Sequence, residues 1–387
     1  MLFKALPLDR AEGAVLERIA DLKRQLAFAI SPKRWYGLLR RNTFARAIQG
    51  SNSIEGYNIS IDDAVAAVEG EQPIDPKTEN WLANVCYCRA MTLVLQKAEA
   101  PDFEYSKEFL NALHYMMLEY DLTKHPGNWR TGPVFVHNSK TEEIVYEGPP
   151  AEDVPALIDE LVAELNEPQP AADTIVRGAM AHLNFVMIHP HSDGNGRMGR
   201  CLQTLVLARG GTVNPVFASI EEYLGRNTGD YYRVLGEVGA GAWHPQRNTR
   251  PWIRFNLTAH FRQATTLLYR SRHLANIFEV CERLAEEHGL DSRTTFALAD
   301  AATGYKVRNA TYRPSADISQ KSATRDLSDL VAAGLLVKKG RKRGTYYERS
   351  EELLKQVVRV PPPAKVPDPF EAREPILPGM KNLVLEG

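Results

Sequence analysis

The chain has 387 residues, more than one ordinary domain needs, which predicts two or three domains. Its 47 basic and 48 acidic residues leave a net charge of −1, which excludes a uniformly basic nucleic-acid coat and an acidic disordered chain. No apolar run approaches the ~18 residues that cross a bilayer, and the first ten residues lack the apolar core of a secretory signal. Four scattered cysteines form no disulfide framework. We therefore expect a cytoplasmic protein with no membrane partner.

Helical patterns dominate the first 120 residues. Apolar side chains recur at spacings of three and four, which is typical of amphipathic helices. Ser60 and Asp63 form a capping-box signature at the start of one of them. The expected fold class is therefore mainly α, with helices over residues 11–30, 42–56, 61–70, 77–99 and 104–119.

The pattern changes between Arg130 and Pro150. Alternating apolar residues flank the turn-forming residues 137–140, which predicts a β-hairpin over residues 131–146. Helical patterns return over 151–166 and 174–188.

The segment with the clearest chemistry is residues 189–200, HPHSDGNGRMGR, between two apolar helices. The Gly194-Asn195-Gly196 stretch begins the second helix, where unpaired N–H groups and the helix dipole attract an anion. Arg197 and Arg200 are three residues apart, so both can reach the same anion. Asp193 offers a hard oxygen ligand suited to Mg²⁺, and His189 offers a base that titrates near neutral pH. This set of residues indicates phosphoryl or nucleotidyl transfer. The alternative is a helix-stop histidine followed by a tight turn.

This segment resembles the signature of the Fic family, His-Pro-Phe-x-Asp/Glu-Gly-Asn-Gly-Arg-x-x-Arg. The resemblance implies a helical Fic core that transfers AMP from ATP to a protein hydroxyl, with His189 as the base that deprotonates the target. It also implies that Asp193 holds Mg²⁺ on the ATP phosphates. The residues implied to bind the phosphate chain are Gly194, Asn195, Gly196, Arg197 and Arg200, the last at its γ end. His191 departs from the usual Phe, which bears on local packing.

Two histidines of this segment, with His182 nearby, also allow a zinc site to be considered. No cysteine or carboxylate completes a tetrahedral spacing, so we favour the nucleotidyl-transfer interpretation.

Residues 51–56, SNSIEG, resemble the inhibitory motif of the same family, Ser/Thr-x-x-x-Glu-Gly/Asn, with Ser51, Glu55 and Gly56 at its defined positions. Gly56 ends the predicted helix, so Glu55 faces the negative end of the helix dipole, which costs about 0.3–1 kcal/mol relative to a favourable charge. The resemblance names Arg200 as its cationic partner. Paired with Glu55, Arg200 could not receive the γ-phosphate. The alternative is an ordinary surface glutamate beside a helix stop.

Two further features match the family by position. The hairpin 131–146 corresponds to the flap, where an extended segment of a target protein could add as a strand; the alternative is an ordinary surface hairpin. Asp230-Tyr231-Tyr232-Arg233 begins a stretch that resembles a helix of the family with an aromatic ring beside the adenine. Tyr231 is the candidate, and the alternative is a tyrosine of the core.

The C-terminal part is locally basic. Residues 305–349 contain eleven basic and four acidic residues, a net charge of +7. A helix over 319–333 and two strands joined by the basic turn 338–344 resemble a winged helix-turn-helix domain, in which a helix enters the major groove of DNA and the wing contacts phosphate. Docking of a protein, or packing on the core alone, stays open.

We therefore expect an autoinhibited Mg²⁺-dependent protein adenylyltransferase. The expected domains are an N-terminal helical region with the inhibitory motif (1–100), a Fic core (101–265), a winged-helix domain (270–350) and a proline-rich tail (351–387). The alternative is a DNA-binding transcriptional regulator whose Fic core senses a nucleotide or a partner. The sequence leaves the target protein and a homo-oligomeric state open.

Overall fold

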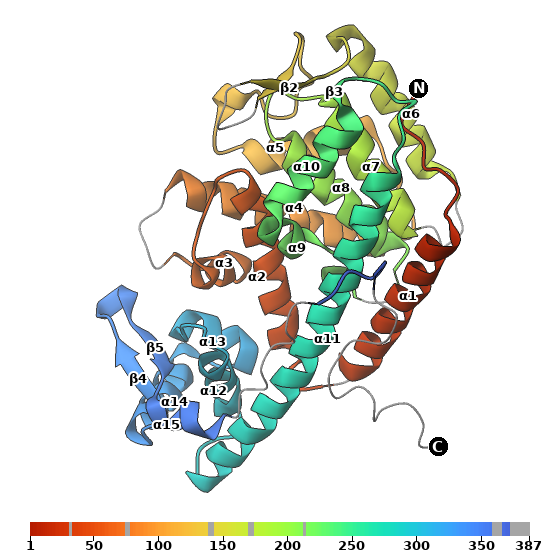
Figure 1. Ribbon diagram of the computed structural model, residues 1–387. Helices are drawn as coiled ribbons and strands as arrows, with labels where there is room; N and C mark the ends of the chain where they lie inside the picture. Colours follow the sequence, from red (N-terminus) through yellow and green to blue (C-terminus); the bar gives the residue numbers. More distant parts are fainter. Residues whose placement is uncertain are drawn as a thin grey trace.

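The computed structural model describes residues 1–30, 33–73, 78–137, 143–168, 174–211, 214–357 and 366–371, without the side chain of Arg343. The described part of the chain is mainly helical (Figure 1), as the apolar periodicity predicts. The helices of residues 1–240 are α1 (Arg10–Ile30), α2 (Tyr36–Ile54), α3 (Ile61–Val68), α4 (Glu79–Glu99), α5 (Lys107–Leu118), α6 (Val154–Asn166), α7 (Thr174–Ile188), α8 (Asn195–Arg209), α9 (Glu221–Arg226) and α10 (Thr228–Gly239). The later helices are α11 (Arg250–Glu287), α12 (Thr294–Ala302), α13 (Asn309–Ala316), α14 (Gln320–Ala332) and α15 (Glu351–Gln356).

Helices α7 and α8 form the centre of the main body. They pack against each other, and α2, α4, α6 and α11 surround them. Nearly every residue of α7 and α8 is buried; α7 is largely apolar, whereas α8 also buries polar side chains, Arg197 and Arg200 among them. The short loop between them, residues 189–194, is therefore held from both sides by core helices.

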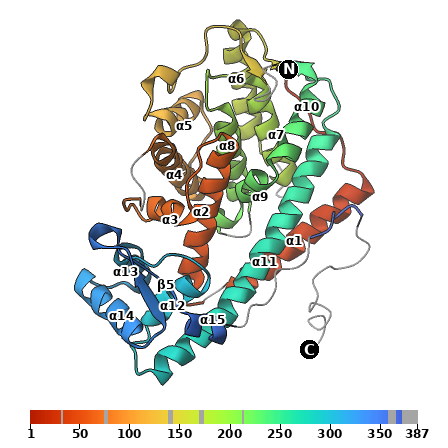
Figure 2. The same ribbon diagram turned by 60° about the vertical axis from the view of Figure 1, so that its left-hand side comes forward.

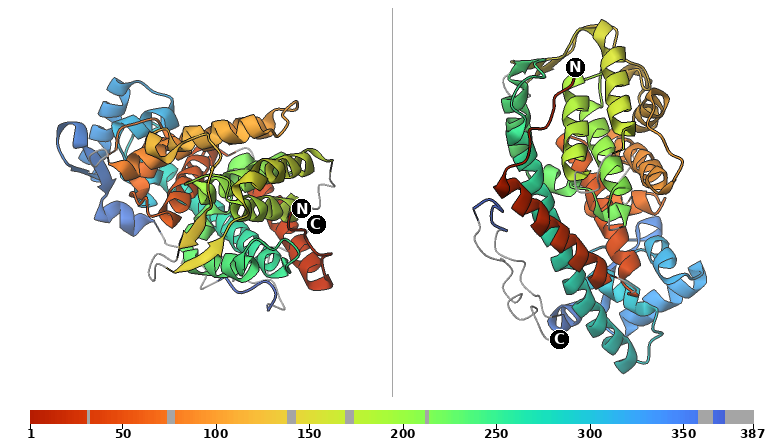
Figure 3. Two further views of the ribbon diagram at one scale, coloured as in Figure 1. Left: turned by 90° about the horizontal axis from the view of Figure 1, so that it is seen from above. Right: turned by 90° about the vertical axis from the view of Figure 1, so that its right-hand side faces the viewer.

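The longest helix, α11, crosses the whole molecule. Its 38 residues extend over roughly 57 Å at 1.5 Å per residue. Helix α1 lies along it and buries Val15, Ile19 and Leu22 against it (Figure 3). The chain start is also fixed, since Leu2 and Phe3 are fully buried.

A small sheet covers one end of this body. Its strands are β1 (Phe135–His137), β2 (Ile144–Glu147) and β3 (Gly241–Ala242), in the order β1-β2-β3. β1 and β2 pair antiparallel, which confirms the strands of the predicted hairpin, and β2 pairs parallel with β3, which was not predicted. Most of the predicted turn, residues 138–142, lies outside the described residues.

The C-terminal unit comprises α12, α13 and α14, followed by the antiparallel strands β4 (Leu336–Lys339) and β5 (Tyr346–Arg349). Val307, ahead of α13, forms a bridge with Tyr347 on β5. This unit lies beside α2 and the far end of α11 (Figures 1 and 2). Its core includes Leu38 and Leu39 of α2, so the unit and α2 share one apolar cluster.

The structure has a helix at each of two predicted domain boundaries. The boundary between 265 and 270 falls inside α11, so the C-terminal unit continues from the main body through one unbroken helix. The predicted tail begins with a helix, α15, whose N-cap Ser350 accepts a hydrogen bond from Leu353 N. Of the rest of the tail, residues 358–365 and 372–387 lie outside the described residues.

Candidate nucleotide-transfer site

The loop between α7 and α8 fixes the backbone and ring of His189. The residue ends α7 with a left-handed φ of 51°, a conformation that a non-glycine residue adopts only when its surroundings hold it there. Nδ1 of the ring lies 3.1 Å from the carbonyl of Val186. If Nδ1 carries the proton and donates it to this carbonyl, Nε2 keeps its lone pair. Burial lowers the pKa of His189, which favours this neutral, basic form.

Arg130 connects this loop to the hairpin, a role that the sequence did not predict. Its guanidinium donates to the carbonyls of His189 (2.8 Å), Gly132 (2.8 Å) and Pro149 (2.6 Å). Gly132 and Pro149 flank the two strands of the hairpin, so one buried side chain joins both ends of the hairpin to the histidine. No local pattern distinguishes this arginine, because its partners lie up to 59 positions away.

Asp193 lies in the same loop beside a cation. Nζ of Lys124 lies 3.2 Å from its Oδ2, and Gly194 N donates to its Oδ1 at 2.6 Å. Burial acts to raise the pKa of Asp193, but Arg197 and Lys124 outweigh it, and the pKa is lowered. The carboxylate is therefore ionised at neutral pH and lies where a cation is stabilised.

His191, the departure from the family signature, is fully buried. Its ring stacks on His114 with centroids 3.5 Å apart, and its Nδ1 lies 2.9 Å from the carbonyl of Asn128. His114 accepts from Gly127 N at 2.8 Å and lies 2.9 Å from the carbonyl of Asp193. The imidazole therefore packs as the expected Phe would, and a second histidine holds the backbone of the loop.

The glycine stretch opens α8 as predicted. Gly194 is its N-cap with φ of 78°, and a Cβ there would lie 3.0 Å from Leu118 and 3.3 Å from His114. Asn195 closes the loop instead of pointing outward, because its side chain bonds both N and O of His191 at 2.9 and 2.8 Å. The groups at this end that could hold an anion are therefore backbone N–H groups and the two arginines.

Arg200 is paired with residues of the 51–56 segment. Its Nη2 lies 2.7 Å from Oε1 of Glu55, and its Nε donates to Oγ of Ser51 at 2.7 Å. Burial opposes the charge of Arg200, yet Glu55 raises the pKa of the guanidinium above its usual value. Glu55 is the C-cap of α2, where Gly56 has φ of 86°, so the helix end directs this carboxylate over the start of α8. A Cβ at Gly196 would collide with it.

Arg197 has a different neighbour from the same segment. Its guanidinium lies 5.0 Å from the ring centroid of Tyr57, two residues after Glu55. It is 1% exposed, and its Nε and Nη1 have no hydrogen-bond partner among the described residues. Tyr57 OH also accepts from Lys124 Nζ at 2.6 Å, so residues 55–57 lie against both arginines and the lysine that contacts Asp193.

A second carboxylate near Arg200, Glu221 of α9, was not predicted either. Burial raises its pKa to about 7, although Arg200 acts in the opposite direction. Its Oε1 accepts from Thr204 at 3.2 Å. Gly50 of α2 allows the close contact of α2 with α9 that brings these groups together, since a Cβ there would lie 2.7 Å from the Glu221 carbonyl.

The structure corrects the prediction for Tyr231. Its ring is 1% exposed and packs in the core, and its hydroxyl lies 2.9 Å from Nε2 of His182. A ring enclosed on all sides has no free face for a base. Tyr232 is 47% exposed, and its hydroxyl lies 3.4 Å from the carbonyl of Ile54, so it lies at the surface beside the 51–56 segment.

The histidines do not form a metal centre. Both ring nitrogens of His182 are engaged, Nδ1 with Gln203 at 2.6 Å and Nε2 with Tyr231. Within the described ranges, no three His, Cys, Asp or Glu side chains gather as metal ligands. No described helix is both long and apolar enough to cross a membrane.

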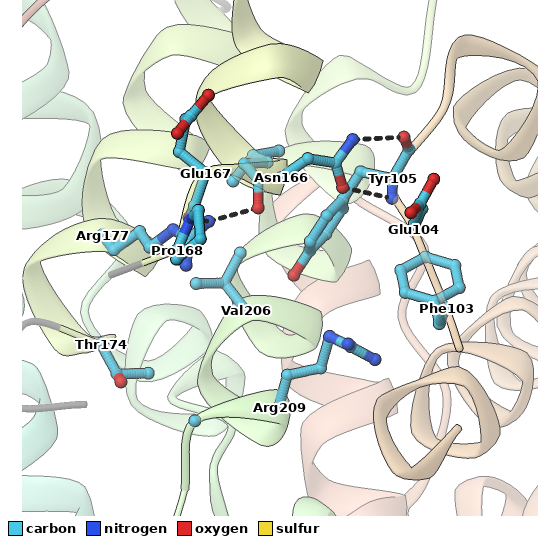
Figure 4. Close-up of a pocket in the computed structure, with 12 residues that line it drawn as sticks. Phe103, Glu104, Tyr105, Asn166, Glu167, Pro168, Thr174, Arg177, Val206 and Arg209 are labelled. Atoms are coloured by element: carbon cyan, nitrogen blue, oxygen red, sulfur yellow. Dashed lines mark hydrogen bonds between the residues drawn. The ribbon is translucent and has the colours of Figure 1, made fainter. Parts of the chain in front are cut away.

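A pocket elsewhere on the main body is lined by residues that include Tyr105, Asn166 and Arg209 (Figure 4). It has a volume of about 410 Å³ and lies at the C-terminal ends of α6 and α8. Because α8 has 15 residues, its two ends are roughly 21 Å apart. Arg177 and Arg209 of this pocket bond to backbone carbonyls, including those of Leu165 and Lys97. It is therefore not part of the histidine site.

Comparison with known proteins agrees with this geometry. Residues 104–207, which include the whole loop, match the Fic/DOC family. The chain is 27% identical over 262 residues to "Protein adenylyltransferase Fic" of Nematostella vectensis, covering 65% of this chain and 55% of that protein. It is 27% identical over 177 residues to "Probable protein adenylyltransferase aq_aa38" of Aquifex aeolicus, covering 45% of this chain and 51% of that protein. The chain thus spans about half the length of the curated relatives it matches.

Solved structures share the fold. A Fic family protein from Desulfovibrio desulfuricans superimposes with a TM-score of 0.57 at 20% identity, covering 90% of this chain and 98% of that one. A Fic domain containing signaling protein from Bacteroides thetaiotaomicron gives a TM-score of 0.53 at 19% identity, covering 66% of this chain and 97% of that one.

Proposed function

We propose that this chain, whose residues 104–207 match the Fic/DOC family, transfers AMP from ATP to the hydroxyl of a serine, threonine or tyrosine on a target protein. The observation that carries the proposal is His189, whose Nδ1 lies against a backbone carbonyl while Arg130 holds the backbone of the same residue. This arrangement leaves Nε2 as a base with a fixed direction.

In the proposed reaction, Nε2 of His189 removes the proton from the target hydroxyl. The hydroxyl oxygen attacks the α-phosphorus of ATP, and the bond between this phosphorus and the oxygen that bridges to the β-phosphate breaks. Pyrophosphate leaves, and AMP stays on the target. The N–H groups at the start of α8 and the guanidiniums of Arg197 and Arg200 would stabilise the charge on the phosphate chain.

Asp193 would hold Mg²⁺ on the ATP phosphates. A single ionised carboxylate suits this ion, which binds to one or two carboxylates and completes its shell with phosphates and water. Nζ of Lys124 lies 3.2 Å from that carboxylate, so a positive charge is already stabilised beside it, which supports a cation-binding role. When bound, the ion would neutralise charge on the phosphates.

We further propose that the 51–56 segment inhibits this reaction. Glu55 and Ser51 use Nη2 and Nε of Arg200, so a γ-phosphate would have to displace the paired carboxylate of Glu55 to reach this buried arginine. Nucleotide would then bind without its α-phosphate in line with the hydroxyl. Removal of Glu55 should release the arginine.

The target protein would dock on β1. This strand is at the edge of the three-stranded sheet, so its outer backbone groups can pair with an extended segment. Phe135 on β1 is 41% exposed and offers an apolar contact to such a segment. The buried, unpaired cysteines of the described chain suit the reducing cytoplasm, where we propose that the protein acts.

A second candidate function is DNA-dependent regulation through the C-terminal unit, read as a winged helix-turn-helix domain. Lys321, Thr324, Arg325 and Ser328 are exposed on one side of α14, the helix before the β4–β5 hairpin. Lys338 and Lys339 on β4 and Arg341 in the turn are also exposed. These are the residue types that contact bases and phosphates in such domains. A gel shift with the full chain tests this function: no binding at low salt removes it.

The direct test of the enzymatic proposal is incubation with ATP and Mg²⁺ followed by mass spectrometry of the chain and of added proteins. A mass increase equal to AMP that depends on His189 supports it. An added mass other than that of AMP would indicate a different donor group. No added mass with the Glu55→Gly variant would count against AMP transfer.

A further inference from the structure

A cavity of about 540 Å³ lies where α2, α11 and the C-terminal unit meet. Each of the three parts contributes to its wall: Thr43 and Arg46 come from α2, Arg270 and Leu274 from α11, and Arg349 and Val357 from the C-terminal unit. Its volume is in the range of roughly 300–1,000 Å³ that is usual for small-molecule sites. It is separate from the histidine loop and from the pocket in Figure 4.

The polar side of this cavity is positively charged. Three arginines and no Asp or Glu are among the residues that line it. The charge of Arg270 is neutralised by Glu222, which does not line the cavity and accepts two hydrogen bonds of 2.6 Å from the guanidinium. Arg46 and Arg349 have no carboxylate within 4.0 Å among the described residues. Arg46 lies 5.6 Å from the ring centroid of Tyr305, and Arg349 donates to a backbone carbonyl. Neither arginine therefore forms an ion pair, although Glu222 acts on Arg46 at longer range.

A buried hydroxyl adds to this polar side. Thr43 is 4% exposed, lines the cavity, and its Oγ1 has no hydrogen-bond partner in the described structure. A buried polar atom without a partner is rare in folded proteins, and a ligand atom is one way to satisfy it. The rest of the wall is largely apolar, with aliphatic side chains that include Leu274, Leu354 and Val357.

We propose that this cavity binds a small carboxylate with an apolar body, such as a medium-chain fatty acid. The carboxylate pairs with Arg46 and Arg349, whose planar guanidiniums match its two oxygens, and accepts from Thr43. The chain lies against the aliphatic wall. No described acidic side chain of the cavity wall competes for these arginines.

Binding at this site would act on the inhibitory helix. Arg46 and Glu55 are both carried by α2, nine residues apart, or about 14 Å along the axis. A ligand that contacts α2, α11 and the C-terminal unit together stabilises the arrangement in which Glu55 meets Arg200, because it binds that arrangement best. The ligand would therefore slow AMP transfer; this step rests on the proposed function, whereas binding itself does not.

The test uses octanoate and the full chain, with octanol and acetate as probes that lack the charge or the chain. We expect saturable octanoate binding in calorimetry, with one site per chain, and no comparable heat with either control. Arg46→Gln/Arg349→Gln should weaken binding by at least ~10-fold, as expected for two charged hydrogen-bonding partners. Arg233→Gln, a change at an arginine of α10 whose side chain is 62% exposed, should leave it unchanged.

A second variant keeps the test decisive if the double variant fails to fold. Leu354 is 41% exposed, so Leu354→Trp should fold, fill the cavity and prevent binding while every arginine stays. Octanoate that does not bind, or that binds all variants equally, overturns the site. Binding that leaves the AMP-transfer rate of the wild type unchanged overturns the link to the inhibitory helix. Absence of AMP transfer in every variant, with binding intact, counts against the proposed function and leaves the site standing.

Discussion

The carboxylate of Glu55 lies 2.7 Å from Nη2 of Arg200, although the two residues are 145 positions apart in the chain. One ends α2 and the other lies in the second turn of α8, so the contact depends on how α2 packs against the central pair of helices. The Arg200 side chain is fully buried, whereas that of Glu55 is 27% exposed. The pair therefore joins a surface segment to a core arginine at the proposed phosphate site.

Ser51 strengthens this contact. Its Oγ accepts from Nε of Arg200 at 2.7 Å, and Ser51→Ala would leave that donor unpaired. We expect AMP transfer to rise by ~10-fold, the effect of losing one hydrogen bond to a charged group, and to stay below that of Glu55→Gly. Ser53→Ala is the matched control, since its hydroxyl donates to Gly50 on the same helix and does not meet Arg200. Equal initial rates for the two variants would contradict the role of Ser51.

Arg130 should be a positioning residue for the base. Arg130→Lys cannot reach three carbonyls at once, so the histidine loop and hairpin would shift relative to each other. In a Glu55→Gly background we expect kcat for AMP transfer to fall by ~100-fold, as a misplaced catalytic group costs, with KM for ATP nearly unchanged. Arg233→Lys serves as the exposed control. A higher KM for ATP with an unchanged kcat would indicate instead that Arg130 contacts the nucleotide.

Glu221 should make stability depend on pH. Its pKa in the folded chain is about 7, above the ordinary 4.5, so the folded state binds its proton more tightly than the unfolded state. The free energy of unfolding gains most from this group below pH 4.5 and loses that gain as pH rises to about 7. Glu221→Gln should remove ~2 kcal/mol of this decrease, as measured by urea unfolding across that pH range. Parallel curves for variant and wild type would rule out this origin.

The junction of α2 with the C-terminal unit depends on a buried ion pair. Arg41 of α2 and Asp300 of α12 are 6% and 4% exposed and lie 2.5 Å apart. Asp300→Ala would leave buried Arg41 with only the more distant carboxylate of Glu69, 4.0 Å from its Nε, and we expect a loss of ~3–5 kcal/mol in the free energy of unfolding. Arg41→Met/Asp300→Leu, which removes both charges, should recover most of this loss. A double variant as unstable as the single one would show that packing, rather than charge, controls the junction.

Much of the fold could be predicted from local patterns. The predicted bounds of α7 agree with the structure, and the alternation around residues 134–146 predicted both strands of the hairpin. The predicted boundary near residue 270 did not anticipate that α11 runs across it, while the buried residues of this helix pass from the cluster of the main body to that of the C-terminal unit. After Pro251, α11 contains no Gly or Pro, which is the signal that could have corrected it.

The candidate site was predictable where its residues are neighbours in sequence, and less so elsewhere. Tyr231, Val234 and Val238 are buried at spacings of three and four, so helical periodicity could have placed Tyr231 inside and Tyr232 outside. Arg130, Lys124 and Glu221 act through partners distant in sequence, which no local pattern reports. Their roles follow from tertiary packing alone.

The most direct test of the proposed inhibition compares three chains after incubation with ATP and Mg²⁺: wild type, Glu55→Gly, and Glu55→Gly/His189→Ala. Intact-mass spectrometry and labelled ATP measure AMP on the chain and on added proteins over time. We predict rapid AMP incorporation with Glu55→Gly, much slower incorporation with the wild type, and none with the double variant. Equal incorporation by wild type and Glu55→Gly, or incorporation that persists without His189, would contradict the account.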